Sequence, residues 1–127
     1  MIKAINFTNV NPISKTTHIK IRKQINHVIK KKDFILGKSL ENFENNYAKL
    51  SNVKFALGCA SGTDALRLAL LSLNLKKDDE VIVPAMTYIS TGLSVLLNNN
   101  KLVFADIDDC TGLISIQDIL NKITKKT

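Results

Sequence analysis

A turn of small residues separates an apolar run from a long helical pattern at residues 55–66. The segment reads Phe-Ala-Leu-Gly-Cys-Ala-Ser-Gly-Thr-Asp-Ala-Leu. Because a helix begins with unpaired backbone N–H groups and a partial positive charge, its first turn suits a phosphate. Ser61 and Thr63 add hydroxyl donors, and Gly62 lets an oxyanion approach the backbone closely. The alternative interpretation is an ordinary strand-to-helix turn capped by Ser61 or Thr63, and most such turns bind nothing.

The segment at residues 78–91 favours the phosphate interpretation. It contains a charged turn and an apolar strand, after which Pro84 and Tyr88 leave the strand end. In an open parallel sheet, ligands bind beyond the carboxyl ends of the strands. We therefore expect Tyr88 on the same edge as the turn at Ser61–Thr63. A phosphate cradle beside a flat ring suits a cofactor that is itself a flat ring with a phosphate.

Hydrophobic periodicity predicts alternating helices and strands along the chain. The expected helices span residues 16–32, 39–50, 63–73, 90–98 and 115–123, and the expected strands span residues 53–57, 80–83 and 101–105. This alternation predicts an α/β fold with a mainly parallel sheet. Three strands make an incomplete layer, so apolar faces are expected to stay uncovered unless more chain or a partner packs on them.

Local signals add details to three of these helices. In the second helix, Leu40, Phe43, Tyr47 and Leu50 form one stripe that we expect to be buried. Ser39 is expected to cap its start, with Glu41 and Glu44 near its positive end. The third helix is apolar on nearly all sides, as expected when it packs within a larger body. The last helix opens with Ser115-Ile116-Gln117-Asp118, which resembles a capping box with Asp in place of Glu.

The charge of the 127-residue chain is unevenly distributed. The formal net charge is +7, and residues 1–54 hold 11 Lys/Arg against 3 Asp/Glu. A basic half suggests nucleic-acid binding. However, the lysine run at residues 30–32 has no interleaved aromatic residues, and Arg occurs only twice. Lysines at the negative end of a helix explain the charge better, and we expect no nucleic-acid partner.

Cysteine usage and hydropathy predict a cytoplasmic protein. Cys59 and Cys110 lie far apart and form no Cys-x-x-Cys pair, so they are expected to be reduced thiols. We expect Cys59 to be a small buried hydrophobic residue. The N-terminus lacks the apolar run of a signal peptide. The longest apolar stretch, at residues 65–75, is too short and too polar to span a membrane.

No metal site is expected. Asp106, Asp108 and Asp109 cluster after the third strand, but the glycine and distal glutamate of a calcium loop are missing. A solvated turn is the better interpretation. His18 and His27 lie nine residues apart on the first helix, without the cysteine or carboxylate pattern of a metal site.

Four blocks of residues carry a resemblance to a known family. They are Phe34–Gly37 followed by Leu40–Glu44, Ser61–Leu66, Asp79–Tyr88, and Val103–Asp108. In this order and spacing they resemble the DegT/StrS-type sugar aminotransferases, which are pyridoxal-phosphate enzymes of the fold-type I aspartate aminotransferase superfamily. The resemblance runs from about Ile5 to the C-terminus. Four ordered blocks are much more specific than a lone glycine motif.

The resemblance implies a fold and a cofactor site. Residues 1–38 would form an N-terminal arm and the first helix, and residues 39–127 the N-terminal part of the large domain. That domain is a three-layer structure with a mainly parallel sheet, here incomplete. The backbone amides around Gly62, Thr63 and Asp64 would hold the phosphate of pyridoxal 5'-phosphate, with the Thr63 hydroxyl as an added donor. Tyr88 would lie against the pyridine ring.

The resemblance also implies an activity and an incomplete chain. Family members transfer an amino group from an amino acid, usually glutamate, to a nucleotide-linked keto-sugar, and they are typically homodimers. They run to roughly three times this length, beyond the usual size of one domain. Their Schiff-base lysine lies downstream, so we nominate no catalytic residue here. We expect an N-terminal portion of an aminotransferase, either a fragment or a truncated gene product.

Two alternatives remain open. The chain is a non-catalytic truncated product that binds cofactor phosphate weakly or assembles only with a full-length relative. Otherwise the fold is kept but transamination is replaced by dehydration, as in relatives that use histidine in place of the lysine.

Overall fold

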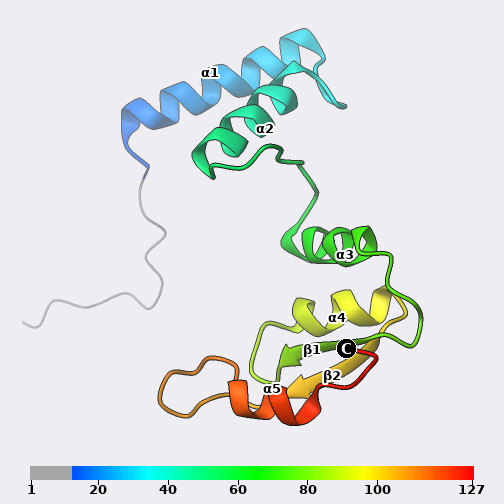
Figure 1. Cartoon of the computed structure of the whole chain (residues 1–127). Helices are drawn as coiled ribbons and strands as arrows, with labels where there is room; N and C mark the ends of the chain where they lie inside the picture. Colours follow the sequence, from blue (N-terminus) through cyan, green and yellow to red (C-terminus); the bar gives the residue numbers. More distant parts are fainter. Residues whose placement is uncertain (1–12) are drawn as a thin grey trace, which may run out of the picture. The chain divides into compact units, whose positions relative to one another are not determined.

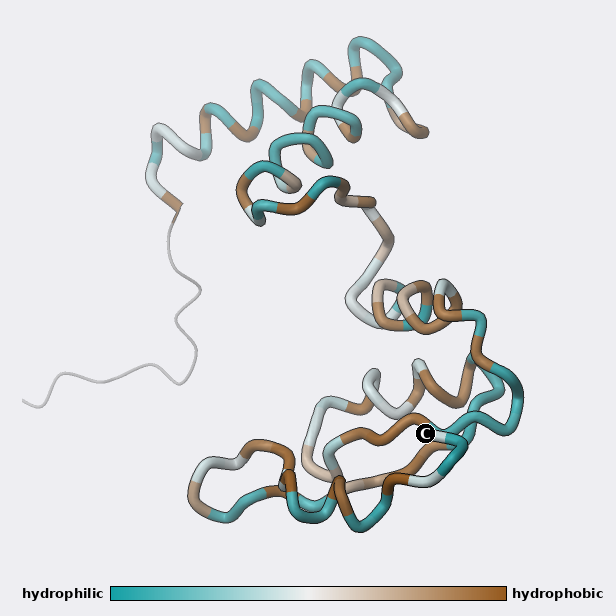
Figure 2. The backbone as a smooth tube through the Cα atoms, viewed as in Figure 1, coloured by the Kyte–Doolittle hydropathy of each residue, from teal (hydrophilic) through white to brown (hydrophobic). Residues whose placement is uncertain are grey.

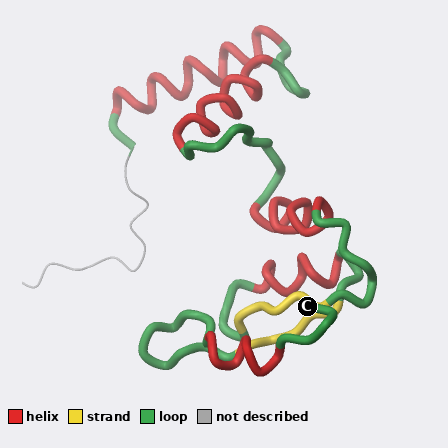
Figure 3. The backbone as a smooth tube through the Cα atoms, viewed as in Figure 1, coloured by secondary structure: helices red, strands yellow, loops and turns green. Residues whose placement is uncertain are grey.

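The computed structural model describes residues 13–127, so the first twelve residues of the expected N-terminal arm lie outside the described part. The chain divides into two compact units, Met1–Gly58 and Cys59–Thr127. Figure 1 shows the elements of both units, and Figure 3 separates helices, strands and loops. The division of the chain into domains at residues 38 and 39 remains a prediction.

The described part of the first unit contains two helices, α1 (Lys15–Lys31) and α2 (Lys38–Leu50). Ser14 caps α1 because its hydroxyl accepts a hydrogen bond from the Thr17 N–H at 3.1 Å. Lys32 ends α1 in the left-handed conformation, with φ of 56°. The helix expected at residues 16–32 is therefore present. Lys30 and Lys31 lie in its last turn, where their positive charges are favourable at the negative end of the helix dipole.

The start of α2 differs from the expected cap. Ser39 lies inside the helix, and the Asp33 carboxylate accepts hydrogen bonds from the N–H groups of Lys38 at 3.0 Å and Ser39 at 2.9 Å. Asp33 thus supplies the cap from outside the helix. A Cβ atom at Gly37 would collide with this carboxylate, which explains the glycine at that position.

Most of the stripe expected to be buried on α2 is exposed in the described structure, where Leu40 is half-buried and Leu50 is exposed. Phe43 and Tyr47 are 58% and 52% exposed, although their rings lie 5.8 Å apart. Ala48 is the buried residue of this helix. The expectation was therefore wrong for Phe43, Tyr47 and Leu50, which no other element within residues 13–58 buries.

Residues 53–57 form no strand, contrary to the sequence prediction. Asn52 adopts a left-handed conformation, with φ of 53°, and the Val53 N–H donates back to Ala48 O at the end of α2. A strand requires a hydrogen-bonded partner, and none of the residues from 13 to 127 pairs with this segment.

The second unit contains α3 (Gly62–Ser72), β1 (Glu80–Pro84), α4 (Ile89–Leu97), β2 (Lys101–Ala105) and α5 (Ile116–Lys122). Strands β1 and β2 pair in parallel, from Glu80 opposite Lys101 to Pro84 opposite Ala105. Helix α4 connects them and packs against both strands, while α3 packs against α4 and α5 against β2. These elements confirm the α/β class predicted from the sequence.

The core of this unit lies between α4 and the strands. Val95 of α4 is 1% exposed, and Val83 and Ala105 of the strands are also buried. A Cβ atom at Gly92 would lie 3.3 Å from Leu102 Cδ2, so the glycine lets α4 approach β2 closely. The strands are largely hydrophobic in Figure 2, as expected for a sheet covered on its faces.

Many large apolar side chains remain exposed, among them Leu57, Leu68, Ile116 and Leu120. This pattern is consistent with an incomplete α/β domain. No helix within residues 13–127 combines the length and the hydropathy that a membrane span requires.

Candidate functional site

The amino ends of α3 and α4 meet. Thr63 Oγ1 lies 2.7 Å from Ser90 Oγ, and each of these residues is the second residue of its helix. Further along, Asn98 Nδ2 just beyond α4 donates to Arg67 O of α3 at 2.9 Å. The two helices therefore run in the same direction, as Figure 1 also shows. Their positive ends converge at one place.

The first turn of α3 has two backbone donors without a partner in the described part of the chain. Ser61 caps the helix, because its hydroxyl accepts from the Asp64 N–H at 3.2 Å and its carbonyl accepts from the Ala65 N–H at 2.9 Å. Among residues 13–127, the N–H groups of Gly62 and Thr63 have no acceptor. A Cβ atom at Gly62 would meet no atom within 4 Å. This turn therefore offers an oxyanion two donors and open space.

Asp64 is already engaged within the turn. Its N–H is bound by Ser61, and its carboxylate accepts from the Ser61 hydroxyl at 3.0 Å. A phosphate would have to share the Asp64 N–H with Ser61. The ordinary helix cap that the sequence offered as an alternative is thus present, and it leaves the two preceding N–H groups available.

Tyr88 follows β1 and occupies the N-cap position of α4. Its side chain is 78% exposed and makes no capping hydrogen bond. Ser90, two residues later, is joined to Thr63. The structure therefore brings Tyr88 to the end of α4 that meets the first turn of α3.

Sequence reasoning missed Ser90. Its hydroxyl is half of the bond that joins the two helices, and the residue is only 9% exposed. No periodicity singles it out, and its partner lies 27 residues away in the chain. Its place in the first turn of an expected helix was the single signal available.

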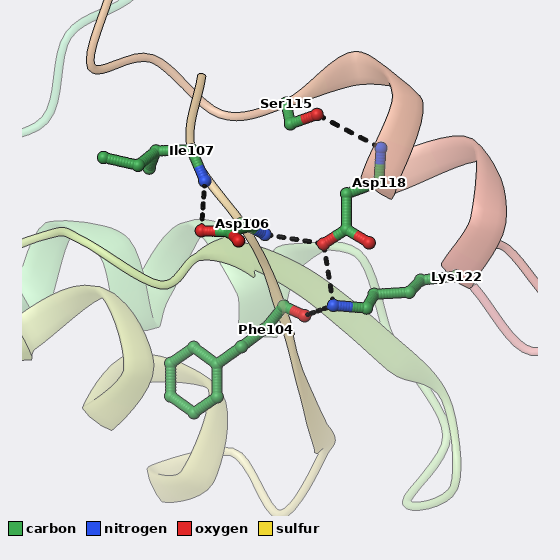
Figure 4. Close-up of polar contacts among 6 residues, drawn as sticks. All are labelled: Phe104, Asp106, Ile107, Ser115, Asp118 and Lys122. Carbon is green, nitrogen blue, oxygen red and sulfur yellow. Dashed lines mark hydrogen bonds and ion pairs between the residues drawn. The ribbon is translucent and has the colours of Figure 1, made fainter. Parts of the chain in front are cut away.

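A second polar network lies at the carboxyl end of β2 and is shown in Figure 4. Asp118 Oδ2 accepts from the Asp106 N–H at 2.6 Å and from Lys122 Nζ at 2.7 Å. Lys122 Nζ also donates to Phe104 O at 2.8 Å. The hydrogen bond from Lys122, followed by that from the Asp106 N–H, lowers the pKa of Asp118 below its ordinary value. This network fastens α5 to the end of the strand.

Only half of the expected capping box forms at α5. The Ser115 hydroxyl accepts from the Asp118 N–H at 3.3 Å, as expected. The Asp118 carboxylate does not return to the Ser115 N–H, which donates to Asp106 O instead. The Asp118 side chain is shorter than the Glu of a capping box, and it accepts from the Asp106 N–H and from Lys122 Nζ. An open cavity of about 560 Å³ is lined by α5 and the ends of both strands.

The acidic cluster after β2 forms turns, as the sequence predicted. Asp108 Oδ1 accepts from the N–H groups of Cys110 and Thr111 and from the Thr111 hydroxyl, and these bonds lower its pKa. No group of three or more potential metal ligands occurs in the part of the chain that the structure describes.

Both cysteines are free and exposed. The expectation that Cys59 is buried was wrong, because Cys59 lies in the turn before α3 rather than beneath the helix. Its thiol donates a weak hydrogen bond to Ser61 O at 3.5 Å.

Residues 16–127 match the model of the DegT/DnrJ/EryC1/StrS aminotransferase family. The chain belongs to this family. The resemblance read from the four sequence blocks is therefore confirmed.

Several similar proteins have names that refer to nucleotide-linked sugars. UDP-N-acetyl-3-dehydro-alpha-D-glucosamine 3-aminotransferase of Acidithiobacillus ferrooxidans is 43% identical over 103 residues, which are 81% of this chain and 28% of that protein. GDP-4-keto-6-deoxy-D-mannose-3-dehydratase of Escherichia coli, solved with hydrated PLP, is 31% identical with a TM-score of 0.76. That alignment covers 84% of this chain and 29% of the dehydratase.

A third relative covers nearly the whole chain. NtdA of Bacillus subtilis, solved with the cofactor PMP, gives a TM-score of 0.87 at 29% identity, over 98% of this chain and 30% of NtdA. These two solved relatives carry PLP or PMP, and the DegT/DnrJ/EryC1/StrS family is one of pyridoxal-phosphate enzymes. The chain spans about a quarter to a third of the length of the relatives it matches.

Proposed function

We propose that this chain forms the phosphate-binding part of a pyridoxal-phosphate-dependent aminotransferase that acts on nucleotide-linked keto-sugars. One observation carries the proposal. Two N–H groups at the start of α3 have no acceptor among residues 13–127. They lie at the end that Thr63 and Ser90 join to α4, which begins beside an exposed Tyr88. Relatives that act on nucleotide-linked sugars, or that carry PLP or PMP, support the choice of ligand.

Each residue has a defined part in this proposal. The N–H groups of Gly62 and Thr63 would donate to the phosphate, and the Thr63 hydroxyl would be a third donor. The Asp64 N–H would be shared between the phosphate and Ser61. Tyr88 would lie against the pyridine ring and fix its orientation. When bound, the cofactor supplies an electron sink for the carbon that carries the amino group.

The rest of the proposed activity is supported by the names of similar proteins. The amino donor is glutamate or a similar amino acid, and the acceptor is a nucleotide-linked keto-sugar. The enzyme works as a cytoplasmic homodimer. No lysine of this chain is assigned to covalent attachment of the cofactor, so we expect the 127-residue chain alone to bind the cofactor without transaminating a sugar.

A second candidate function is dehydration of a nucleotide-linked keto-sugar. The likeness to the Escherichia coli dehydratase favours it, at 31% identity. The same proposed cofactor site, the first turn of α3 with Tyr88, would serve both reactions. A non-catalytic alternative uses the same site: the chain binds only the cofactor phosphate, weakly, or assembles only with a full-length relative.

The test is titration of the chain with pyridoxamine phosphate and, in parallel, with pyridoxamine. Neither compound has an aldehyde, so neither labels surface lysines. The phosphorus NMR signal reports the phosphate, and tyrosine fluorescence reports the ring. We expect pyridoxamine phosphate to bind at least about tenfold more tightly than pyridoxamine, because two to three hydrogen bonds to a charged group are added.

Gly62→Asp is the sharpest variant for this test. A side chain fits there without a clash, and an acidic residue suits the first turn of a helix, so folding is kept. Its charge repels the phosphate, and we expect affinity for pyridoxamine phosphate to fall about tenfold or more. Asn99→Asp adds the same charge just after the C-cap of α4, away from the end that meets α3, and serves as the control. Equal binding of both compounds, or an unchanged affinity in Gly62→Asp, would contradict the proposal.

A further inference from the structure

The bond between Thr63 and Ser90 joins a buried hydroxyl to a more accessible one. Ser90 is 9% exposed, whereas Thr63 is half-buried on the first turn of α3. The two oxygens are 2.7 Å apart, and either one can be the donor. Among the described residues, neither side-chain oxygen has another hydrogen-bond partner.

The direction of this bond decides what Thr63 offers to a ligand. A hydroxyl carries one proton and two lone pairs. If the Thr63 hydroxyl donates to Ser90, only its lone pairs can point toward the open space beside Gly62. If Ser90 donates to Thr63, the Thr63 proton is free to point into that space. A phosphate is rich in acceptors, so it favours the second arrangement alone.

We propose that Ser90 is a positioning residue for the anion site at the start of α3. It donates its proton to Thr63 Oγ1 and thereby directs the Thr63 proton to the phosphate. This inference rests on the proposed function. Hydrogen bonds in such a chain polarise one another, so the outer bond from Thr63 is strengthened by the buried one.

The same hydrogen bond links the two parts of the proposed cofactor site, the first turn of α3 and the start of α4. Ser90 lies two residues after Tyr88, and Thr63 lies one residue after Gly62. The contact between Asn98 and Arg67 O holds the other parts of the two helices in line. Ser90 therefore fixes the distance between the phosphate-binding turn and the aromatic side chain at the start of α4.

The chain offers a matched control for this role. Ser94 lies on the same helix, is also buried, and donates to Thr91 O at 2.8 Å rather than to Thr63. Ser90→Ala and Ser94→Ala therefore remove the same group from similar surroundings. Only the first change removes the donor to Thr63.

The experiment measures the affinity of four variants for pyridoxamine phosphate, inorganic phosphate and pyridoxamine. The variants are Ser90→Ala, Ser94→Ala, Thr63→Val and the double variant at 63 and 90. We expect Ser90→Ala and Thr63→Val each to weaken both phosphate ligands by about fivefold, the effect of one hydrogen bond. The double variant should lose no more than Thr63→Val alone. Pyridoxamine affinity should stay the same, and Ser94→Ala should match the wild type.

Each other outcome has a defined meaning. If the wild type prefers phosphate ligands but Ser90→Ala binds them like Ser94→Ala, the positioning role is overturned and the proposed function stands. Additive losses in the double variant would also overturn it, since the two hydroxyls would then act independently. If the wild type shows no preference for phosphate, both proposals fail. Ser90→Cys keeps the side-chain shape with a weaker donor, and serves if Ser90→Ala does not fold; an unchanged phosphate affinity in it would overturn the role.

Discussion

Asp64 places a negative charge in the same helical turn as the two N–H groups assigned to a phosphate. The Ser61 hydroxyl holds its carboxylate at 3.0 Å, so the charge is fixed at the helix start. An acidic residue there stabilises the helix through the dipole. The same charge opposes an anionic ligand. Folding of α3 and phosphate binding therefore place opposite demands on this residue.

Replacing this charge should improve binding. Asp64→Asn keeps an oxygen that accepts from Ser61 and removes the repulsion, so we expect about threefold tighter binding of pyridoxamine phosphate at low salt. The gain should shrink as salt screens the charge. Asp109→Asn, in the exposed turn after β2, is the control and should leave affinity unchanged. Weaker binding in Asp64→Asn would mean that the carboxylate itself supports the site.

At this scale, the sequence identified residues by chemical type and failed where a contact spans the chain. Gly62, Thr63 and Tyr88 were nominated because a strand-turn-helix pattern and an aromatic residue are visible locally, and their roles remain predictions. Ser90 was not nominated, because its importance depends on how α3 packs against α4. The burial of Cys59 was predicted from the residue type alone, and the exposed turn overrides that preference.

Helix α2 begins where a carboxylate from the preceding loop satisfies its first N–H groups. Asp33 binds both Lys38 N and Ser39 N, and these bonds lower its pKa. The hydrogen bond from the Ser39 N–H is the largest cause of the shift. The loop from Lys32 to Gly37 is therefore part of the helix start and not a free linker.

Two substitutions distinguish this cap from the one expected from sequence. Asp33→Ala should speed amide exchange at Lys38 and Ser39 about fivefold, because both N–H groups lose their acceptor. Ser39→Ala keeps the backbone N–H and should change exchange much less. Amide hydrogen exchange followed by NMR measures both variants. A larger effect from Ser39→Ala would restore the cap that the sequence suggested.

Elements were predictable where local pattern and packing agree. The strand at residues 101–105 matches β2, and the helices at both sides of it match α4 and α5 within a few residues. The segment at residues 53–57 has the alternation of a strand, but a strand exists only with a partner. The sequence pattern does not show whether a partner strand is present. For the same reason it does not show whether another element packs on the apolar stripe of α2.

On the scale of the whole molecule, Glu80 ties together three segments of the second unit. Its carboxylate accepts from Lys101 Nζ at 2.7 Å and from the Thr124 hydroxyl at 2.6 Å. Its backbone N–H donates to Lys126 O at 2.8 Å. The start of β1 is thus joined to the start of β2 and to the last residues of the chain. The Glu80 side chain is 7% exposed despite its charge.

This arrangement predicts a pH range of greatest stability. The hydrogen bond from Lys101 lowers the pKa of Glu80 below its ordinary 4.5, so the contribution is present above pH 4.5 and is lost as pH falls through the lowered pKa. The bond to Glu80 raises the pKa of Lys101 above its ordinary 10.5. That contribution is present below pH 10.5 and is lost as pH rises through the raised pKa.

Urea unfolding of Glu80→Gln measures the effect. We expect a lower urea midpoint at neutral pH and a flatter pH dependence than in the wild type, most clearly on the alkaline side. Acidic pH also protonates Asp33, Asp108 and Asp118, whose pKa values are lowered too. Glu41→Gln removes an exposed ion pair with Lys38 and is the control. A pH profile that is the same in wild type and Glu80→Gln would mean that this pair does not stabilise the unit.

The parallel register of β1 and β2 has a consequence for synthesis of the protein. Glu80 and Lys101 face each other across the sheet but are separated by 21 positions, with all of α4 between them. Since ribosomes add about 5–20 residues per second, these 21 positions take about one to four seconds to synthesise, so the start of β1 leaves the ribosome before its partner. During that interval Val81–Val83 is a hydrophobic strand segment with free backbone groups. The nascent chain therefore passes through a brief stage at which a chaperone or another nascent chain competes with β2.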